Sequence, residues 1–527
     1  MSKLSKSTRA IVIAAAVLLV LGVVFMVLML TEPKGEESSA VSDSGTSTSQ
    51  TSSEVDKSLI LTDKEGTDIL SAKITNELGS YTFKRDKRVV STTDSDGNVT
   101  SSDQYFWVSE EMAGLKHNDT TIKAFMNCLA GLTASEMVEE NAEDLAKYGL
   151  ETPVAKAEIA FEDGTSAELL FGIQNPAATN NVYCRMGDSR NVLMVSFYSV
   201  GDAYEPVTNF VNLTLTEGYN ANSPKELDYL IIERKDLDEP VEMSYMYDIQ
   251  EEAQDIDSVI TTFNSHRITS PLVAEVDSTK GQTICYGLYG LSAAYCVSVD
   301  SDEELLEQTG LDDPYCKVTF KYGGQRRVLL LGDQIITETQ TEDEETPTLT
   351  TVAGYFGMME GSDAVYAFTT DSAPWYTFSL QDIVSRRPIS PYIYTVDTLT
   401  ITTPDKEYLF KVNGDAKENS FVYGELELDG DKFRALYQQL ISAVGDELFL
   451  TEGDYEPYIS VRFDYRSEYE EVYGTDHDVL EFYRSDDRKN IVRVNGKVLF
   501  KVRQVYTERL LENLDALITG GEIRLDW

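Results

Sequence analysis

The stretch Pro-Val-Ala-Lys-Ala-Glu-Ile-Ala-Phe, residues 153–161, carries the pattern that decides the fold. A proline is followed, after three residues, by apolar side chains at every second position, and the pattern returns at 314–322 and 457–465. The apolar positions are Ala157, Ile159 and Phe161, then Val318, Phe320 and Tyr322, then Val461, Phe463 and Tyr465. A period of two is typical of a half-buried strand, and the proline marks its entry. We therefore predict one strand-rich unit used three times.

The register of these strands also predicts which side chains are buried. Successive residues of a strand face opposite sides of the sheet, so a slip of one residue would reverse the faces. One residue of each copy should lie in the core: Ile159, Phe320 and Phe463. Its neighbour in each copy should point to solvent or to a junction between units: Glu158, Thr319 and Arg462.

Each unit is predicted to contain one amphipathic helix before the Pro-led strand. Asn118-Asp119 can cap a helix with the apolar stripe Ile122, Phe125, Met126 and Leu129. Asp429 or Asp431 can cap a second helix, which Gly445 can end, with the stripe Phe433, Leu436, Tyr437, Leu440 and Val444. The residues Val259, Ile260 and Phe263 suggest a shorter helix in the second unit. The predicted fold class is α+β, with repeated modules of antiparallel sheet and hairpins.

Glycines accompany the repeat. Gly149-Leu150 and Gly310-Leu311 precede the first two prolines, and the partner strands are predicted to end at Gly172 and Gly332. In the third unit Asn495-Gly496 separates two alternating segments, which is a strong signal for a tight hairpin. The repeat is too long for a propeller blade or a small solenoid. Three similar modules in a row, or one fused sheet assembly, agree with this spacing.

The start of the chain predicts a membrane anchor. Residues 10–30 form an uncharged apolar run about 31 Å long as a helix, which is enough to cross a bilayer core. Basic residues precede it, so the tail 1–9 is predicted to stay in the cytoplasm and the rest of the chain to lie outside the cell membrane. A cleaved signal peptide is the alternative. The Ser/Thr-rich stretch within 31–57 is predicted to be a flexible linker.

Length and charge limit the number of modules and the kinds of partner that the exported part can have. Three modules are predicted, at 58–235, 236–395 and 396–527, the last a partial repeat. The formal net charge is −46, and the basic residues do not form runs. Nucleic acid and anionic lipid head groups are therefore disfavoured as partners. The negative charge can serve solubility outside the cell, or it can form a surface that attracts cations.

The sequence holds five cysteines, so an exported chain would leave at least one thiol unpaired or paired with another molecule. Cys285 and Cys296 flank the segment 286–290, which is predicted to form a hairpin. A disulfide across that hairpin is feasible. The cysteine spacing resembles no metal site, so the hydrophobic core is expected to hold the fold.

A search for chemistry finds no catalytic or cofactor motif. The three histidines, His117, His266 and His477, are far apart in the sequence, and each is expected to be a surface or structural residue. The segment 94–98 superficially resembles a calcium loop but lacks the glutamate at loop position twelve. We predict no catalytic residue, no metal and no cofactor. Arg386 and Arg387 are the notable basic pair, either ion-paired within the fold or at an interface.

The motifs resemble the family catalogued as domain of unknown function 4340. The stretch 144–153, Asp-Leu-Ala-Lys-Tyr-Gly-Leu-Glu-Thr-Pro, is similar to the family's signature, and the resemblance is densest from Asn141 to Val195. A looser match runs from Leu306 to Ile401 and includes the segment 381–387, while the third unit lacks the Gly-Leu. Members are typically anchored by one N-terminal helix and encoded beside the ATPase and permease of an ABC transporter and an auxiliary membrane protein. No catalytic residues are established for the family.

Two functions remain open at this point. The first is a non-enzymatic, membrane-anchored extracytoplasmic accessory protein that docks onto an ABC-type transport system. Repeated modules, the anchor, the missing catalytic motif and the family resemblance favour it. The alternative is a cell-envelope hydrolase or ligand-binding protein with a cleft between the first two modules, for which paired carboxylates would be needed.

Overall fold

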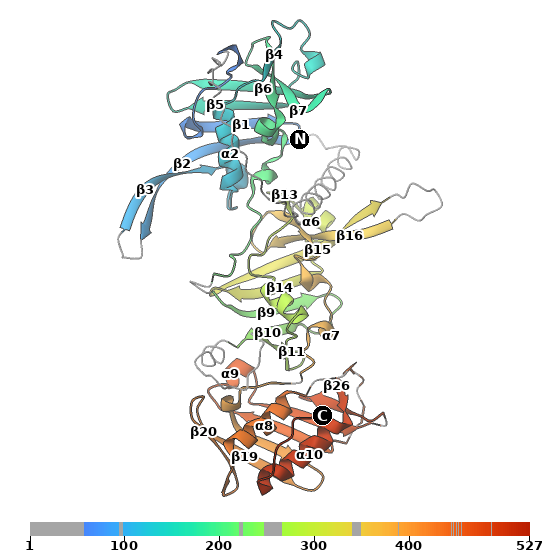
Figure 1. Cartoon of the computed structure of the whole chain (residues 1–527). Helices are drawn as coiled ribbons and strands as arrows, with labels where there is room; N and C mark the ends of the chain where they lie inside the picture. Colours follow the sequence, from blue (N-terminus) through green and yellow to red (C-terminus); the bar gives the residue numbers. More distant parts are fainter. Residues whose placement is uncertain are drawn as a thin grey trace, which may run out of the picture.

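Three antiparallel sheets follow one another along an elongated molecule (Figure 1). The computed structural model describes residues 57–527 apart from 94–98, 221–224, 247–265, 340–348 and the single positions 388, 444, 446, 450, 452, 455 and 486. Four predictions lie outside these residues: the span 10–30, nearly all of the linker 31–57, the loop 94–98 and the short helix near Val259–Phe263. In the part of the chain that the structure describes, no helix is both long and apolar enough to cross a membrane.

The first sheet has eight strands in the order β3-β2-β1-β5-β6-β7-β8-β4. They are β1 (Ile69–Asn76), β2 (Gly79–Thr93), β3 (Val99–Val108), β4 (Glu136–Glu139), β5 (Ala155–Phe161), β6 (Ser166–Asn175), β7 (Ala178–Met186) and β8 (Val192–Ser196). Helix α2 (Asp119–Ala130) and the short α3 (Phe197–Val200) accompany the sheet. The predicted stripe of α2 is buried, and the Asn118 side chain accepts a hydrogen bond from the backbone of Thr121, as a cap does.

The second sheet has nine strands in the order β12-β11-β10-β9-β14-β15-β16-β17-β13. They are β9 (Leu227–Arg234), β10 (Val241–Tyr245), β11 (His266–Ser270), β12 (Ala274–Glu275), β13 (Tyr295–Ser298), β14 (Cys316–Tyr322), β15 (Gln325–Thr339), β16 (Leu349–Met359) and β17 (Val365–Thr369), with helices α5 (Lys280–Tyr286), α6 (Glu303–Thr309) and α7 (Leu380–Ile383). Strand β9 pairs with β10 and β14, so this sheet begins before residue 236, where the second module was predicted to start.

The third sheet has nine strands in the order β21-β20-β19-β18-β23-β24-β25-β26-β22. They are β18 (Val396–Thr402), β19 (Glu407–Gly414), β20 (Asn419–Tyr423), β21 (Leu426–Glu427), β22 (Glu447–Leu448), β23 (Ile459–Tyr465), β24 (His477–Arg484), β25 (Lys489–Val494) and β26 (Lys497–Arg503), with α8 (Gly430–Ile441), α9 (Glu470–Tyr473) and α10 (Gln504–Thr519). Asp429 caps α8 as predicted, but the helix ends at Ile441, before Gly445. Helix α10, which packs beside α8, was not predicted.

The Pro-led strands β5, β14 and β23 occupy the same position in the three sheets. Each lies between the strand that opens its sheet (β1, β9 or β18) and its hairpin partner (β6, β15 or β24). The three predicted core residues are buried: Ile159, Phe320 and Phe463. The repeat, and the α+β class with antiparallel sheets, are therefore confirmed.

The predicted exposure of the outward-facing residues is confirmed only in part. Glu158 is exposed and Arg462 is half-buried, but Thr319 is only 6% exposed, so the prediction for Thr319 was wrong. Its neighbours on the same face are Lys317 and Lys321, which form ion pairs with Glu233 and Asp228 on β9. A short side chain between two long ion-paired ones is covered by their aliphatic stems.

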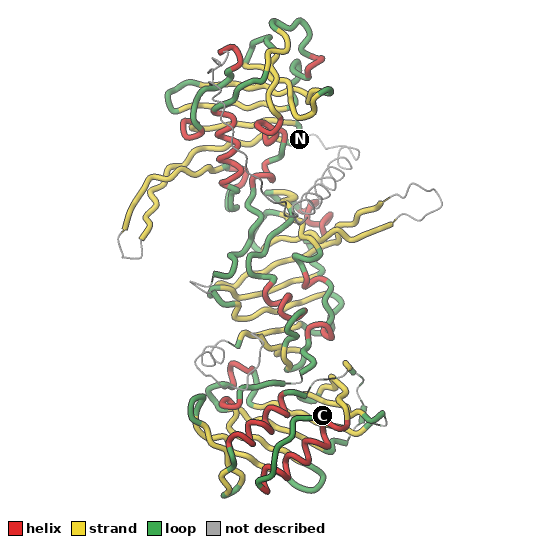
Figure 2. Tube along the Cα trace, in the orientation of Figure 1, coloured by secondary structure: helices red, strands yellow, loops and turns green. Residues whose placement is uncertain are grey.

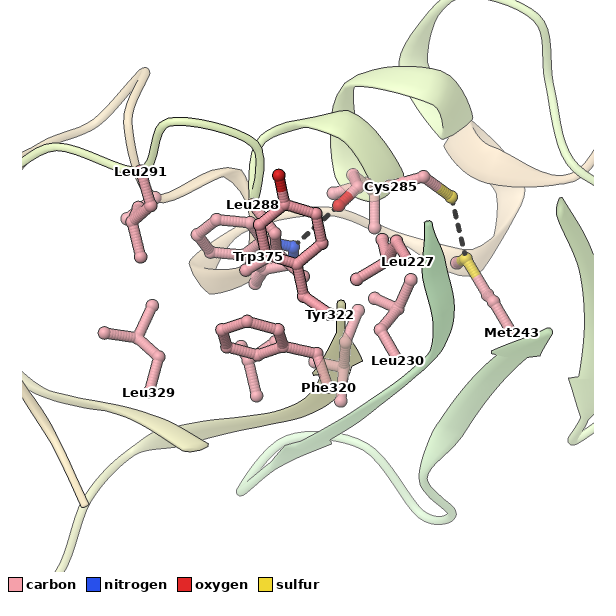
Figure 3. Packing of buried hydrophobic residues seen from close by; sticks show 14 of the residues in the cluster. Leu227, Leu230, Met243, Cys285, Leu288, Leu291, Phe320, Tyr322, Leu329 and Trp375 are labelled. Atoms are coloured by element: carbon pink, nitrogen blue, oxygen red, sulfur yellow. Dashed lines mark hydrogen bonds between the residues drawn. The ribbon is translucent and has the colours of Figure 1, made fainter. Parts of the chain in front are cut away.

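The core of the second sheet lies beneath α5 (Figure 3). The Trp375 indole Nε1 donates a hydrogen bond to the carbonyl of Ile284, 2.9 Å away. The Cys285 thiol on α5 lies 3.6 Å from the sulfur of Met243, while Cys296 lies on β13 and all five thiols are free. The hairpin predicted at 286–290 was therefore wrong, and the disulfide considered between Cys285 and Cys296 is absent, because the chain up to Tyr286 forms a helix that turns Ile284 and Cys285 into the core.

The glycines of the repeat are explained by a close approach between two segments. Gly310 has a positive φ of 65°, and a Cβ on Gly332 would lie 2.1 Å from the carbonyl oxygen of Thr309. Gly149 and Gly172 form the same contact in the first module, so larger residues are excluded from these sites. The prediction that the partner strands end at Gly172 and Gly332 was wrong, because β6 and β15 continue beyond these glycines after an irregularity in register.

Candidate functional site between the second and third sheets

The predicted interface residues Arg386 and Arg387 lie where the chain passes from the second sheet to the third. Both side chains are exposed. The carbonyl of Arg386 accepts a hydrogen bond from the backbone of Gly445 at 2.9 Å, and the backbone of Arg387 donates to the Ser385 hydroxyl at 3.1 Å. This segment therefore ties the loop after α8 to the second sheet. A role for the two arginines in binding a partner stays a prediction.

Behind this segment lies a buried ion pair between the sheets. The Ser385 backbone donates to the carbonyl of Glu275 at 2.8 Å, and Glu275 on β12 is the register partner of Arg267 on β11. Arg267 donates from Nη2 to Oδ2 of Asp478 on β24, and the two side chains are 1% and 0% exposed. The pair therefore joins two modules through charges that are fully removed from water.

Other side chains complete the surroundings of Asp478. The hydroxyl of Tyr465 donates to its Oδ2 at 2.5 Å, and the Asn495 amide donates to its Oδ1 at 2.8 Å. The same amide contacts the carbonyl of Val273 in the second module at 3.3 Å. Both oxygens of the carboxylate are thus occupied, which is the condition under which a buried charge is tolerated.

The electrostatics of this junction keep the Arg267 guanidinium charged. Burial alone would lower the pKa of Arg267, but the charge of Asp478, with Tyr465 and Glu275, raises it. Burial raises the pKa of Tyr465, and the neighbouring Asp478 raises it further, so the phenol stays a donor. The guanidinium lies 5.0 Å from the ring centre of Tyr473. Within the described part of the chain, its Nε and Nη1 have no hydrogen-bond partner, so Asp478 carries most of the compensation.

A shallow pocket of about 360 Å³ opens beside the junction. It is lined by Val273, Thr475, His477, Val479, Glu481, Asn495 and Gly496. The His477 Nδ1 lies 2.6 Å from Asp476, and Glu481 accepts a hydrogen bond from the Tyr483 hydroxyl at 2.7 Å. Glu481 is the only carboxylate among the lining residues, so this pocket does not contain the carboxylate pair that glycoside hydrolysis requires.

The other two histidines lie in separate places. His117 Nε2 accepts from the Ser109 backbone at 3.2 Å, and burial lowers its pKa. His266 is fully buried and donates from Nε2 to the carbonyl of Leu227 at 2.8 Å, and burial lowers its pKa to about 4. Among the described residues, no group of His, Cys, Asp and Glu side chains is arranged to hold a metal ion.

Two long hairpins extend beyond their sheets and form arms (Figure 2). The β15–β16 strands have 15 and 11 residues, whereas the equivalent pairs have 10 and 9 (β6–β7) and 8 and 6 (β24–β25). The β2–β3 strands have 15 and 10 residues, against 5 and 5 (β10–β11) and 8 and 5 (β19–β20). Since the other modules fold without them, the arms are additions that the fold does not need.

The arms also expose apolar side chains. Ile336 and Val352 are direct cross-strand partners on the β15–β16 arm and are both exposed, as is Val89 on the β2–β3 arm. Beyond Leu331, β15 pairs with β16 alone among the described strands, and it continues for about 25 Å at the rise of an extended strand. Long unprotected edges of this kind are templates for pairing with another chain. The length of the arms was not predicted from the sequence.

A comparison with protein families identifies one part of the chain. Residues 107–235 match the model described as "Domain of unknown function (DUF4340)". The match includes α2, the glycine contact of the first module and β9 of the second sheet, but it does not reach the looser resemblance from Leu306 to Ile401. No curated protein and no solved structure matches the chain. Residues 107–235 therefore match the DUF4340 family, as the resemblance at 144–153 indicated.

Proposed function

We propose that the chain is a non-enzymatic, single-pass membrane protein that works outside the cell membrane as an accessory subunit of an ABC-type transport system. The apolar run 10–30 would anchor it with its N-terminus in the cytoplasm, and 31–57 would act as a tether. The partners would be the permease and ATPase of the transporter and an auxiliary membrane protein. The observation that carries the proposal is the pair of arms, which project from a framework of modules that does not require them.

The remaining features support a scaffold rather than a catalyst. The buried pair Arg267–Asp478 sets the third module against the second, so a partner bound to one module would be held at a defined place relative to the other. The arms present apolar and hydroxyl side chains, which suit a protein surface. The net charge of −46 disfavours contact with anionic lipid head groups, so the modules would stand off the membrane.

The test is recovery of the transporter with the tagged, full-length chain from membranes in a mild detergent. The intact chain should retain the permease and the ATPase. A variant in which an Asn-Gly turn replaces residues 334–353 should lose them, while unchanged hydrogen exchange in peptides from β9, β14 and α5 shows that the second module is folded. Shortening the β2–β3 arm in the same way shows which arm docks. Recovery of the intact chain without a permease or ATPase would refute the proposal, and retention after loss of both arms would refute the role of the arms.

A further inference from the structure

Three tyrosines form a partly exposed aromatic surface on the second module, beside the start of β9 and the end of β14. The tyrosine cluster consists of Tyr219, Tyr286 and Tyr289. The ring centres of Tyr219 and Tyr289 lie 5.8 Å apart with their planes at 88°, and those of Tyr286 and Tyr289 lie 5.5 Å apart at 42°. Tyr219 is 61% exposed and Tyr286 is 44% exposed, so a large part of each side chain is accessible to solvent. Burial of ring faces would be the ordinary arrangement for side chains that serve only the core.

The backbone holds these rings in place. The Gly290 backbone donates to the carbonyl of Glu217 at 2.9 Å, which joins the segment before Tyr219 to the segment after Tyr289. The Tyr289 hydroxyl accepts a hydrogen bond from the backbone of Leu227 at 3.1 Å. Tyr322 supports Tyr289 from β14 with its ring centre 5.1 Å away and its plane at 84°. The cluster is therefore formed before any ligand arrives, which lowers the entropy cost of binding.

The Glu226 carboxylate accompanies the rings. Glu226 is half-buried, and in the described part of the chain no lysine or arginine forms an ion pair with it, whereas its neighbour Lys225 pairs with Glu217. Burial raises the pKa of Glu226, although a hydrogen bond from Tyr245 opposes the shift. Glu226 directly precedes Leu227, whose backbone donates to the Tyr289 hydroxyl at 3.1 Å, so Glu226 lies beside the cluster. A positive charge placed here would stabilise the ionised form.

We propose that the tyrosine cluster, together with Glu226, binds an organic ammonium group. The faces of tyrosine rings attract cations, and quaternary ammonium groups in particular are held by several rings and a nearby carboxylate. The net charge of −46 raises the local concentration of cations and excludes anionic ligands. The inference does not depend on the proposed association with a transporter.

The experiment compares choline with 3,3-dimethylbutan-1-ol, its neutral isostere, by saturation-transfer NMR on the full-length chain in a maltoside detergent. Choline should bind with a dissociation constant on the order of 1 mM, and the isostere at least tenfold more weakly. Tyr219→Leu and Tyr286→Leu should each weaken choline binding severalfold. Glu226→Gln should weaken choline and leave the isostere unchanged, because only the charge is removed.

The matched control is Tyr198→Leu, which removes a tyrosine that is 83% exposed in the first module. It should leave choline binding unchanged. Vesicles of phosphatidylcholine, added in place of choline, distinguish a lipid head group from a free ammonium compound, and binding of either form supports the site. Equal binding of choline and its isostere, or equal losses for Tyr198→Leu and Tyr219→Leu, would overturn the proposal.

Discussion

Replacing Asp478 by asparagine tests whether one buried ion pair locks the second and third modules together. The substitution keeps the size of the side chain and removes the charge that compensates Arg267. Breaking a fully buried pair by removing one partner typically costs about 3–5 kcal/mol. Glu275 lies opposite Arg267 in the β11–β12 register and would offset part of the loss, so we expect about 3 kcal/mol.

Hydrogen exchange read by mass spectrometry can locate this loss. A destabilisation of about 3 kcal/mol corresponds to faster exchange by roughly two orders of magnitude in amides that exchange by opening of the junction. We expect this increase in peptides from β10–β12 and β23–β25 of the full-length Asp478→Asn variant. Peptides from β5–β8 belong to the first module and should exchange as in the wild type, so they serve as the internal control.

Two further variants separate charge compensation from general damage. The double substitution Arg267→Met with Asp478→Leu removes both charges and should recover much of the stability that Asp478→Asn loses. Arg85 pairs with Glu162 at 2.8 Å, but Glu162 is largely exposed, so Glu162→Gln should cost under about 1 kcal/mol. Wild-type exchange in Asp478→Asn, or a double variant as unstable as the single one, would refute the argument.

Three other predictions follow from single sites. Gly332→Ala places a Cβ into a carbonyl and should destabilise the second module by about 3 kcal/mol in urea unfolding, whereas Gly218→Ala, which meets nothing within 4 Å, should be nearly neutral. Phe320→Ala should cost about 3–5 kcal/mol in the same assay, and a loss below about 1 kcal/mol would contradict its burial. His266 has a pKa of about 4 in the folded state against about 6.5 unfolded, so its stabilisation is complete above pH 6.5 and falls by up to roughly 3 kcal/mol as the pH drops towards 4. His266→Gln should remove this component of the pH dependence, and an unchanged pH profile would contradict it.

Local patterns predicted much of the framework. The alternation after each proline indicated β5, β14 and β23, because the two-residue period of a strand is visible in any half-buried segment. The Asn495-Gly496 turn between β25 and β26 was visible for a similar reason, since both residues adopt positive φ there. Helix α10 carried a readable stripe at Tyr506, Leu510, Leu514 and Leu517 that the repeat interpretation left out. These features depend on residues within a few positions of one another.

Some local readings failed because packing overrode them. The segment 286–290 was interpreted as a hairpin from its Tyr and Gly residues, but burial of Ile284 and Cys285 just before it favours a helix that runs to Tyr286. Thr319 was assigned to solvent on the strength of alternation alone. Thr319 is buried because its charged neighbours on β14 form ion pairs with acidic residues of β9. The sequence of β14 alone does not reveal those partners.

The sequence by itself determined the repeated Pro-led strands, the Asn495-Gly496 hairpin and the helices α2 and α8, since short-range periodicity and capping are local properties. Only the tertiary structure decided the sites. Arg267 and Asp478 are 211 residues apart and meet because the second and third sheets are neighbours. Tyr219 reaches Tyr289 because the backbone segments that carry them are joined between Glu217 and Gly290. A contact between distant residues leaves no periodic mark on either segment, so its chemistry becomes visible only when the chain has folded.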